Sequence, residues 1–290
     1  MSNKSTKNIQ LAFMLNLGFS IFELIGGLYV NSISIISDSI HDFGDSLSIG
    51  LSWLLDQKAN KKPNEKFTYG YLRFSVLGAL INSLILTIGS LIMIYNAVSR
   101  LISPQEINYN GVFKLAFVGL LANGYGAFKT SKGKAISEKV ISLHLLEDVL
   151  GWASILICSI IMKIFDFPIL DPILSIFISI FILFNVFKNI KKIFEVFLEK
   201  SPNNIDTNSI INSLKENKSI VDIHHIHIWT MDHINNYCTL HVVIKNDETT
   251  QSIIKIKEYI RNELKKYEIK HVTIEIEFNN ELCDSSTFQP

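Results

Sequence analysis

Cysteine is scarce in this sequence. The 290 residues include three cysteines, Cys158, Cys238 and Cys283, which lie far apart and form no CxxC pair. This pattern excludes a disulfide framework and a zinc ribbon, and it fits free thiols in a reducing compartment. The sequence also lacks HExxH and any serine or cysteine nucleophile next to a base, which argues against a hydrolytic enzyme.

Charged residues are also few. They make up 19% of the chain, against 48% hydrophobic residues, and 27 basic side chains balance 27 acidic ones. The balanced charge argues against a nucleic-acid-binding protein, and the high hydrophobicity indicates a membrane protein. No small-residue cleavage site follows the first apolar segment, so we interpret this segment as a retained span rather than a signal peptide.

Apolar stretches fill most of the first two thirds of the chain. Six of them approach the roughly 20 residues that a helix needs to cross a bilayer. They cover residues 9–30, 33–56, 72–97, 110–129, 138–164 and 168–193. Lysines gather in alternate connections, so the positive-inside rule places both termini in the cytoplasm. We therefore predict a six-helix transmembrane bundle over residues 1–200, in a multi-pass protein of the cell membrane.

The pattern changes from Ser201 onward. Helix-type and strand-type segments follow one another at residues 205–217, 220–232, 237–245, 249–267 and 271–278. The two adjacent strands are expected to form a hairpin around "DHINN". Two helices and three strands of this size predict an α+β layer with both helices on one face of the sheet. Residues 201–290 are therefore predicted to form a soluble cytoplasmic domain.

Histidine is placed selectively. The chain has eight histidines, of which two lie in predicted spans, six lie in the tail and none lies in the loops between spans. The two membrane histidines are each followed four residues later by aspartate, as His41 with Asp45 and His144 with Asp148. Side chains four residues apart share one face of a helix. Each pair therefore presents an imidazole and a carboxylate to one point.

The two HxxxD pairs are expected at matching depth. At about 1.5 Å per residue, both lie near the middle of a bilayer core that is about 30 Å thick. The two spans run in opposite directions, so the four side chains can converge in one layer and form a tetrahedral shell suited to Zn²⁺. A lone intramembrane histidine or aspartate is more often a helix-packing or proton-relay residue. Two copies on antiparallel spans favour a metal site, because unpaired carboxylates are costly at this depth.

Such a site also predicts a mechanism. Metal binding requires neutral histidine and ionised aspartate, so protons compete with the metal. A site that faces each side of the membrane in turn would exchange Zn²⁺ for H⁺. Asp38 lies on the His41 face and is a candidate for lining the approach, whereas Asp42 is expected on another face. Glu147 is a candidate for a spare ligand, a vestibule charge or a partner for another helix, and we favour the vestibule charge.

Several motifs carry a resemblance to a known family. They are "NSISIISDSIHDFGDS", "YGYLRFSVLGALINSLIL", "SLHLLEDVLGWAS", "DPILSIFISI" and "DIHHIHIW". On these motifs, over nearly its full length, the chain resembles the cation diffusion facilitator family. The resemblance implies a homodimer of six-span protomers that exports Zn²⁺ in exchange for H⁺, with a ferredoxin-like cytoplasmic domain that dimerises on binding metal. His41, Asp45, His144 and Asp148 match the family's transport site one by one.

The resemblance also points to a second metal site in the tail. His224, His241 and Glu277 are the positions that best match the family's regulatory zinc site, and His271 and Cys283 are further candidate ligands. Strand histidines are often structural, and that interpretation stays open for His225, His227 and His233. The loop "DQKANKKPNEKFTYG" has no histidine, so no metal site is expected at the membrane surface.

The membrane histidines also allow other functions. A membrane protease or hydrolase could use the same zinc, and a haem-binding electron carrier could use His41 and His144 as axial ligands. A zinc sensor without transport would explain the tail. The haem alternative leaves the two carboxylates without a purpose, and the sensor does not explain four donors at the middle of the membrane. A transporter of Zn²⁺ accounts for both regions, and the family resemblance implies Cd²⁺ and Co²⁺ as related substrates.

Overall fold

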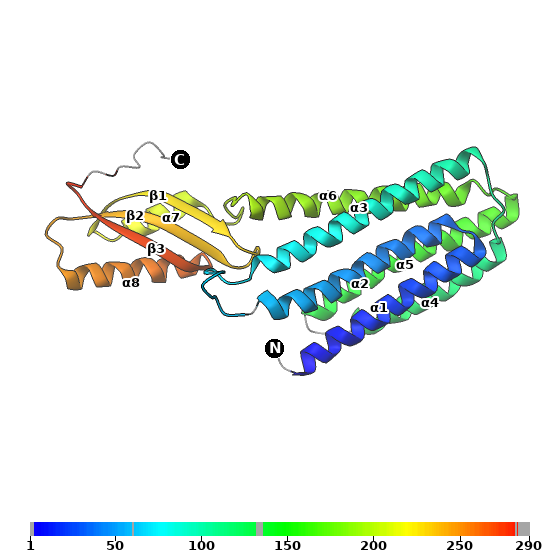
Figure 1. Ribbon diagram of the computed structural model, residues 1–290, viewed down its shortest axis with the longest axis horizontal. Helices are drawn as coiled ribbons and strands as arrows, with labels where there is room; N and C mark the ends of the chain where they lie inside the picture. Colours follow the sequence, from blue (N-terminus) through cyan, green and yellow to red (C-terminus); the bar gives the residue numbers. More distant parts are fainter. Residues whose placement is uncertain (1–2, 60, 132–135, 282, 284–290) are drawn as a thin grey trace. The chain divides into compact units, whose positions relative to one another are not determined.

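The computed structural model describes residues 3–59, 61–131, 136–281 and 283 (Figure 1). Contacts divide the chain into two compact units. One comprises residues 1–58 and 77–190, and the other comprises residues 59–76 and 191–290. The second unit thus includes the segment between the second and third long helices together with the tail. The predicted boundary at residue 200 stays a prediction, because these units are defined by contacts and not by the membrane.

Six long helices form the first two thirds of the described chain (Figure 1). They are α1 (Asn3–Val30), α2 (Ile33–Ala59), α3 (Arg73–Ile102), α4 (Tyr109–Ser131), α5 (Ile136–Phe165) and α6 (Leu170–Phe197). Each contains one of the predicted spans or most of it. The described parts of α3, α5 and α6 are long and apolar enough by themselves to cross a membrane. The helical multi-pass domain that the sequence predicts is therefore confirmed.

Buried serines and an aspartate join α2 to α6. Asp171, in the first turn of α6, is fully buried and accepts hydrogen bonds from the Ile33 amide at 2.7 Å and from both the amide and the hydroxyl of Ser34. One turn further along, the Ser37 hydroxyl lies 2.8 Å from that of Ser175. The amides at a helix start need such acceptors where water is absent. These hydrogen bonds hold the first turns of α2 against α6, and they thereby set the direction in which the polar face of α2 points.

The tail forms an α+β domain. Strands β1 (Ile220–Thr230) and β2 (Asn236–Ile244) are antiparallel, and β3 (Ile269–Phe278) pairs with β2 in parallel, which gives the order β1-β2-β3. Helices α7 (Thr207–Lys215) and α8 (Thr250–Lys266) contribute Ile210, Leu214, Ile256, Ile260 and Leu264 to the core that covers one sheet face. The predicted hairpin around "DHINN" and the order of elements are confirmed.

Alternation along the strands leaves the other sheet face polar. On β2, Cys238, Leu240 and Val242 are buried in the core, whereas Tyr237, Thr239 and His241 are only partly buried. A strand turns successive side chains to opposite faces. His241 is therefore on the face opposite the helices, and pairing places it opposite His224 on β1 and Glu275 on β3. The fold thus brings titratable side chains of three strands to one place.

Candidate metal sites

A cavity of about 410 Å³ lies among α2, α5 and α6. Asp38 and His41 of α2 line it together with Glu147 and Asp148 of α5. Apolar side chains of α6 form much of its remaining wall, among them Leu174, Phe177, Ile178, Phe181 and Ile182. Imidazole and carboxylate donors therefore face a space with a largely apolar lining. Such a lining strengthens the attraction between carboxylates and a divalent cation.

The HxxxD pair on α2 forms as its spacing predicts. His41 Nε2 lies 3.7 Å from Asp45 Oδ2, and about a quarter of each side chain is exposed. The side chain of His144 lies outside the described residues, although its backbone is part of α5. The structure thus brings His41 close to Asp45 and places His41 and Asp148 around one cavity. The complete four-residue transport site stays a prediction.

Two acidic residues near His41 are more buried than the sequence alone indicates. Asp38 is 7% exposed and lines the cavity, and a β-carbon at Gly151 of α5 would lie 3.5 Å from its carboxylate oxygen. Asp42 does not line the cavity and is 4% exposed. The α2 face behind His41 is therefore packed against protein, which hydropathy by itself does not indicate.

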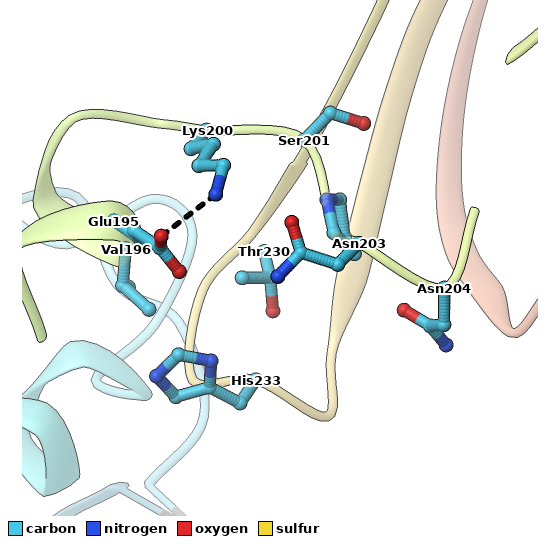
Figure 2. Close-up of a pocket in the computed structure, with 9 residues that line it drawn as sticks. Glu195, Val196, Lys200, Ser201, Asn203, Asn204, Thr230 and His233 are labelled. Atoms are coloured by element: carbon cyan, nitrogen blue, oxygen red, sulfur yellow. Dashed lines mark hydrogen bonds and ion pairs between the residues drawn. The ribbon is translucent and has the colours of Figure 1, made fainter. Parts of the chain in front are cut away.

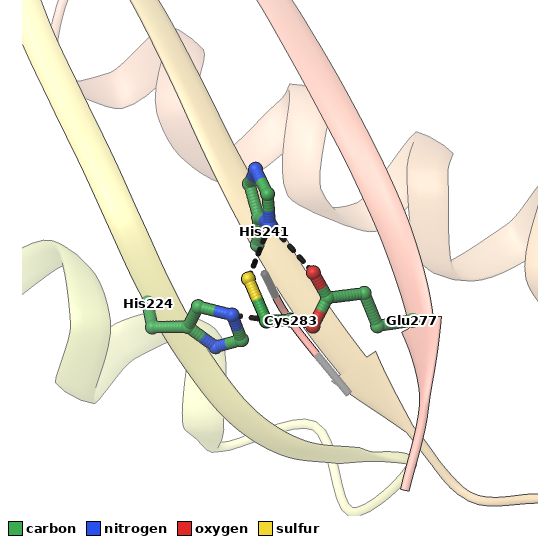
Figure 3. A group of neighbouring side chains, drawn as sticks. All are labelled: His224, His241, Glu277 and Cys283. Carbon is green, nitrogen blue, oxygen red and sulfur yellow. Dashed lines mark hydrogen bonds and ion pairs between the residues drawn. The ribbon is translucent and has the colours of Figure 1, made fainter. Parts of the chain in front are cut away.

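A second cluster lies on the open face of the sheet. His224, His241, Glu277 and Cys283 each offer a ligand atom, and these atoms all lie within 4.8 Å of one another (Figure 3). Glu277 Oε1 is 2.6 Å from His241 Nδ1, and its Oε2 is 3.2 Å from His224 Nε2. Two imidazoles, a carboxylate and a thiolate match the donor set and number of a tetrahedral zinc site.

The charge state of Glu277 fits a ligand role. Burial raises the pKa of its carboxyl, but the hydrogen bond with His241 and the charge of His224 outweigh burial and hold that pKa below its usual value. The carboxylate is therefore ionised at neutral pH and available to a cation. The other ring nitrogen of His241, Nε2, lies 3.3 Å from Glu275 Oε2. A carboxylate in that position orients a metal-binding imidazole.

The tail candidates divide into two groups. His224, His241 and Glu277 come together as expected, and Cys283 joins them from beyond the end of β3. His271 instead lies beside Tyr237 and Tyr69, with ring centres 5.2 and 6.0 Å away. No spacing rule links Cys283 to residues on three strands, so its place in the cluster depends on the path of the chain after β3.

A smaller cavity lies where α6 ends and the tail begins (Figure 2). It measures about 230 Å³ and is lined by Glu195, Lys200 and His233, among others. The Lys200 ammonium lies 2.7 Å from the Glu195 carboxylate. Because this ion pair neutralises the carboxylate, the cavity attracts a metal ion less than the two clusters described above.

The chain matches two models of protein families. The model for the cation efflux transmembrane domain matches residues 9–198, and the model for the cation efflux protein cytoplasmic domain matches residues 202–279. Together the two models cover both regions of the chain.

Similar proteins align along nearly the whole chain. A Bacillus velezensis protein named cadmium, cobalt and zinc/H(+)-K(+) antiporter is 31% identical over 100% of this chain and 95% of its own length. Zinc transporter ZitB of Yersinia pseudotuberculosis is 30% identical over 96% of this chain and 89% of its own. Zinc transporter ZitB of Escherichia coli is 26% identical over 95% of this chain and 88% of its own length. Both regions therefore have counterparts in these relatives.

Proposed function

Since the chain belongs to the cation efflux family, we propose that it exports Zn²⁺ from the cytoplasm in exchange for H⁺. The chain is a transporter and not an enzyme, so the protease and hydrolase alternatives no longer apply. Cd²⁺ and Co²⁺ are proposed as further substrates, because the Bacillus relatives are named for cadmium, cobalt and zinc. Those names also include K⁺, which is a second candidate for the counter-ion.

The observation that carries this proposal is the cavity among α2, α5 and α6. It brings Asp38 and His41 of one helix to Glu147 and Asp148 of another inside a mostly apolar wall. We propose that His41, Asp45, His144 and Asp148 bind the transported ion there in a four-coordinate shell. Asp38 and Glu147 are then charges along the approach, which draw the cation in and are hydrated when the cavity opens.

Proton exchange follows from the chemistry of the ligands. An imidazole binds metal only when neutral and an aspartate only when ionised, so loading with metal displaces protons. Release on the opposite side allows protons to rebind and neutralises the carboxylates inside the membrane, where unpaired charge is costly. Alternating access of one site therefore couples the two ions, and the proton gradient drives metal out of the cell.

The cytoplasmic domain is proposed to sense the exported ion. His224, His241, Glu277 and Cys283 offer four donors for Zn²⁺, and the resemblance to the family implies a homodimer whose tails associate on binding metal. We place both termini in the cytoplasm of a cell-membrane protein, because lysines concentrate in alternate loops. Rising cytoplasmic Zn²⁺ would then favour the dimer that exports it.

Zn²⁺ flux into proteoliposomes tests the transport site. Purified protein is reconstituted, an acidic interior is imposed, and Zn²⁺ entry is followed with an internal fluorescent indicator. Asp45→Ala and Asp148→Ala are each expected to reduce entry to the rate of protein-free liposomes, because either change removes a charged ligand.

The control is Asp166→Ala, which removes a carboxylate between α5 and α6, outside the cavity lining. This variant should transport Zn²⁺ at the wild-type rate. All variants are compared at equal amounts of folded protein, judged by elution from a sizing column. Unchanged flux in both ligand variants would rule out the proposed site.

A further inference from the structure

A third imidazole, that of His225, lies next to the two imidazoles of the cytoplasmic cluster. The ring centre of His225 lies 5.1 Å from that of His224 and 5.1 Å from that of His241, and the latter two are 5.3 Å apart. The three rings thus form a nearly equilateral triangle. His227, the next histidine on β1, is exposed and 6.4 Å from His225. His225 therefore lies beside the two histidines of the cluster, although it is not one of the four residues whose donor atoms lie within 4.8 Å of one another, and His227 lies farther away.

A break in the strand pairing places His225 there. The register of β1 against β2 shifts between His224 and His227, and His225 has a φ of +48°. A positive φ is uncommon for residues other than glycine, although histidine adopts it more often than most. Strand bulges redirect side chains next to functional sites, and such backbone strain persists where the surroundings enforce it. The local distortion places the rings of two consecutive histidines at similar distances from the ring of His241, 5.3 and 5.1 Å, whereas a regular strand turns successive side chains to opposite faces.

One ring nitrogen of His225 is also buried and has no hydrogen-bond partner among the residues that the structure describes. The residue is 5% exposed, and its Nε2 atom has no hydrogen bond within the described part of the chain. The same holds for Nε2 of His224, which lies near Glu277 but is not aligned for a hydrogen bond. A buried polar atom without a partner costs roughly 1–3 kcal/mol, and an absent ion is one recognised explanation.

We propose that His225 is a metal ligand of the cytoplasmic site that occupies the fourth coordination position in place of Cys283. This inference rests on the metal-sensing role proposed above for the tail. His224, His241 and Glu277 supply three donors, and a tetrahedral zinc ion takes only one more. Two side chains of different softness, an imidazole and a thiolate, are available for that place.

Because either His225 or Cys283 can fill the fourth position, the set of donor atoms depends on which metal is bound. Cadmium is a softer ion than cobalt or zinc, so it retains the thiolate of Cys283, whereas imidazole suits Co²⁺ and Zn²⁺ well. Cys283 lies beyond β3, while His225 is held within a paired strand. The site consequently keeps four donors when the thiol is lost, and it binds one ion in either form.

A double-mutant cycle tests the shared position. The full-length protein carries Asp148→Ala, which disables the proposed transport site so that the tail ion is measured alone. Zn²⁺ affinity is determined by competition with a chelator for His225→Gly, Cys283→Ser and both together. Glycine removes the imidazole and accepts the positive φ without strain. The matched control is His227→Ala on the same strand.

Redundancy predicts a specific pattern of affinities. Each single change should weaken Zn²⁺ binding by no more than about tenfold, because the other side chain takes the vacant place. The double change should weaken it by about a thousandfold, and the excess over the product of the single effects, about tenfold, corresponds to about 1.4 kcal/mol of coupling. The control should bind like the parent.

The number of Zn²⁺ ions bound per protomer shows whether His225 and Cys283 share one ion or bind two separate ions. One Zn²⁺ per protomer in the parent, retained in each single variant, supports the exchange. Two ions per protomer in the parent, falling to one in His225→Gly, would overturn it, and so would additive effects of the two changes. Absence of any Zn²⁺ from the parent would overturn both this inference and the sensing role, while transport by the wild-type protein would be unaffected.

Discussion

The membrane domain and the cytoplasmic domain gather metal donors in different ways. In the membrane domain, helical spacing sets His41 3.7 Å from Asp45, beside a cavity of about 410 Å³. In the cytoplasmic domain, three strands and the segment after β3 bring four donor atoms within 4.8 Å of one another. Donors that line a cavity can take up and release an ion. Four donor atoms that lie close together, as in the cytoplasmic cluster, retain it. This difference fits the roles proposed above, in which the membrane site moves the metal and the cytoplasmic site senses it.

Removing a ligand of the cytoplasmic cluster should have the largest effect on the affinity for Zn²⁺. His241→Ala removes an imidazole that contacts both Glu277 and Glu275. Loss of a partner outside the ligand shell already weakens metal binding about 10–100-fold, so loss of a direct ligand should weaken Zn²⁺ binding by at least about a hundredfold. Chelator competition on the full-length Asp148→Ala protein measures this, together with Zn²⁺-dependent dimerisation in detergent.

Thr239→Ala is the control for that experiment. Thr239 lies on the same face of β2, one alternation before His241, and is not among the four clustered donors. It should leave Zn²⁺ affinity within about twofold of the parent. Equal affinities for the His241 and Thr239 variants would contradict the ligand assignment.

The proposed transport site should still transport cations when one ligand is replaced, but its selectivity among cations should change. His41→Asp replaces a nitrogen donor with oxygen, which harder ions such as Mn²⁺ prefer. The ratio of Mn²⁺ to Zn²⁺ transport should rise by about tenfold. Flux of each cation into proteoliposomes measures the ratio, and a wild-type selectivity profile would remove His41 from the ligand set.

The two tail cysteines should differ in reactivity. Burial raises the pKa of the Cys238 thiol to about 12, and the residue is 0% exposed, so it stays protonated and unreactive through the neutral range. Cys283 is only partly buried and should be alkylated quickly, except when Cd²⁺ covers its sulfur. Mass spectrometry of a Cys158→Ser protein with and without Cd²⁺ measures both. Alkylation of Cys283 that Cd²⁺ does not slow would separate this thiol from the metal site.

The packing of α4 against α5, away from the cavity lining, should have the smallest effect on metal binding. A β-carbon at Gly119 of α4 would overlap the indole of Trp152, which is 1% exposed on α5. Gly119→Ala should therefore destabilise the helix pair by about 1–3 kcal/mol. A β-carbon at Gly124 of the same helix would meet no atom of the described chain within 4 Å, so Gly124→Ala is the matched control. Thermal unfolding in detergent compares them, and equal midpoints would contradict the packing.

The sequence is sufficient to predict what depends on periodicity. Apolar runs and lysine placement predict the long helices, and alternation predicts the strands of the tail to within a few residues. The i,i+4 rule also predicts the contact between His41 and Asp45. These features are local, so each is encoded within one segment.

Features that depend on tertiary packing could not be predicted in the same way. The burial of Asp42, the bulge that turns His225 inward and the return of Cys283 to the sheet each require segments far apart in the chain. No spacing in "DIHHIHIW" indicates which histidine has a positive φ. The membrane site was thus easier to propose from the sequence than the details of the cytoplasmic one.

Metal uptake into everted membrane vesicles tests the central claim most directly. Export from the cytoplasm becomes uptake in this orientation, and Zn²⁺, Cd²⁺, Co²⁺ and Mn²⁺ are compared with and without a pH gradient, with K⁺ held equal on both sides. We expect Zn²⁺ uptake that depends on an acidic interior and stops when the gradient is collapsed. Zn²⁺ uptake of equal rate without the gradient would contradict exchange for protons.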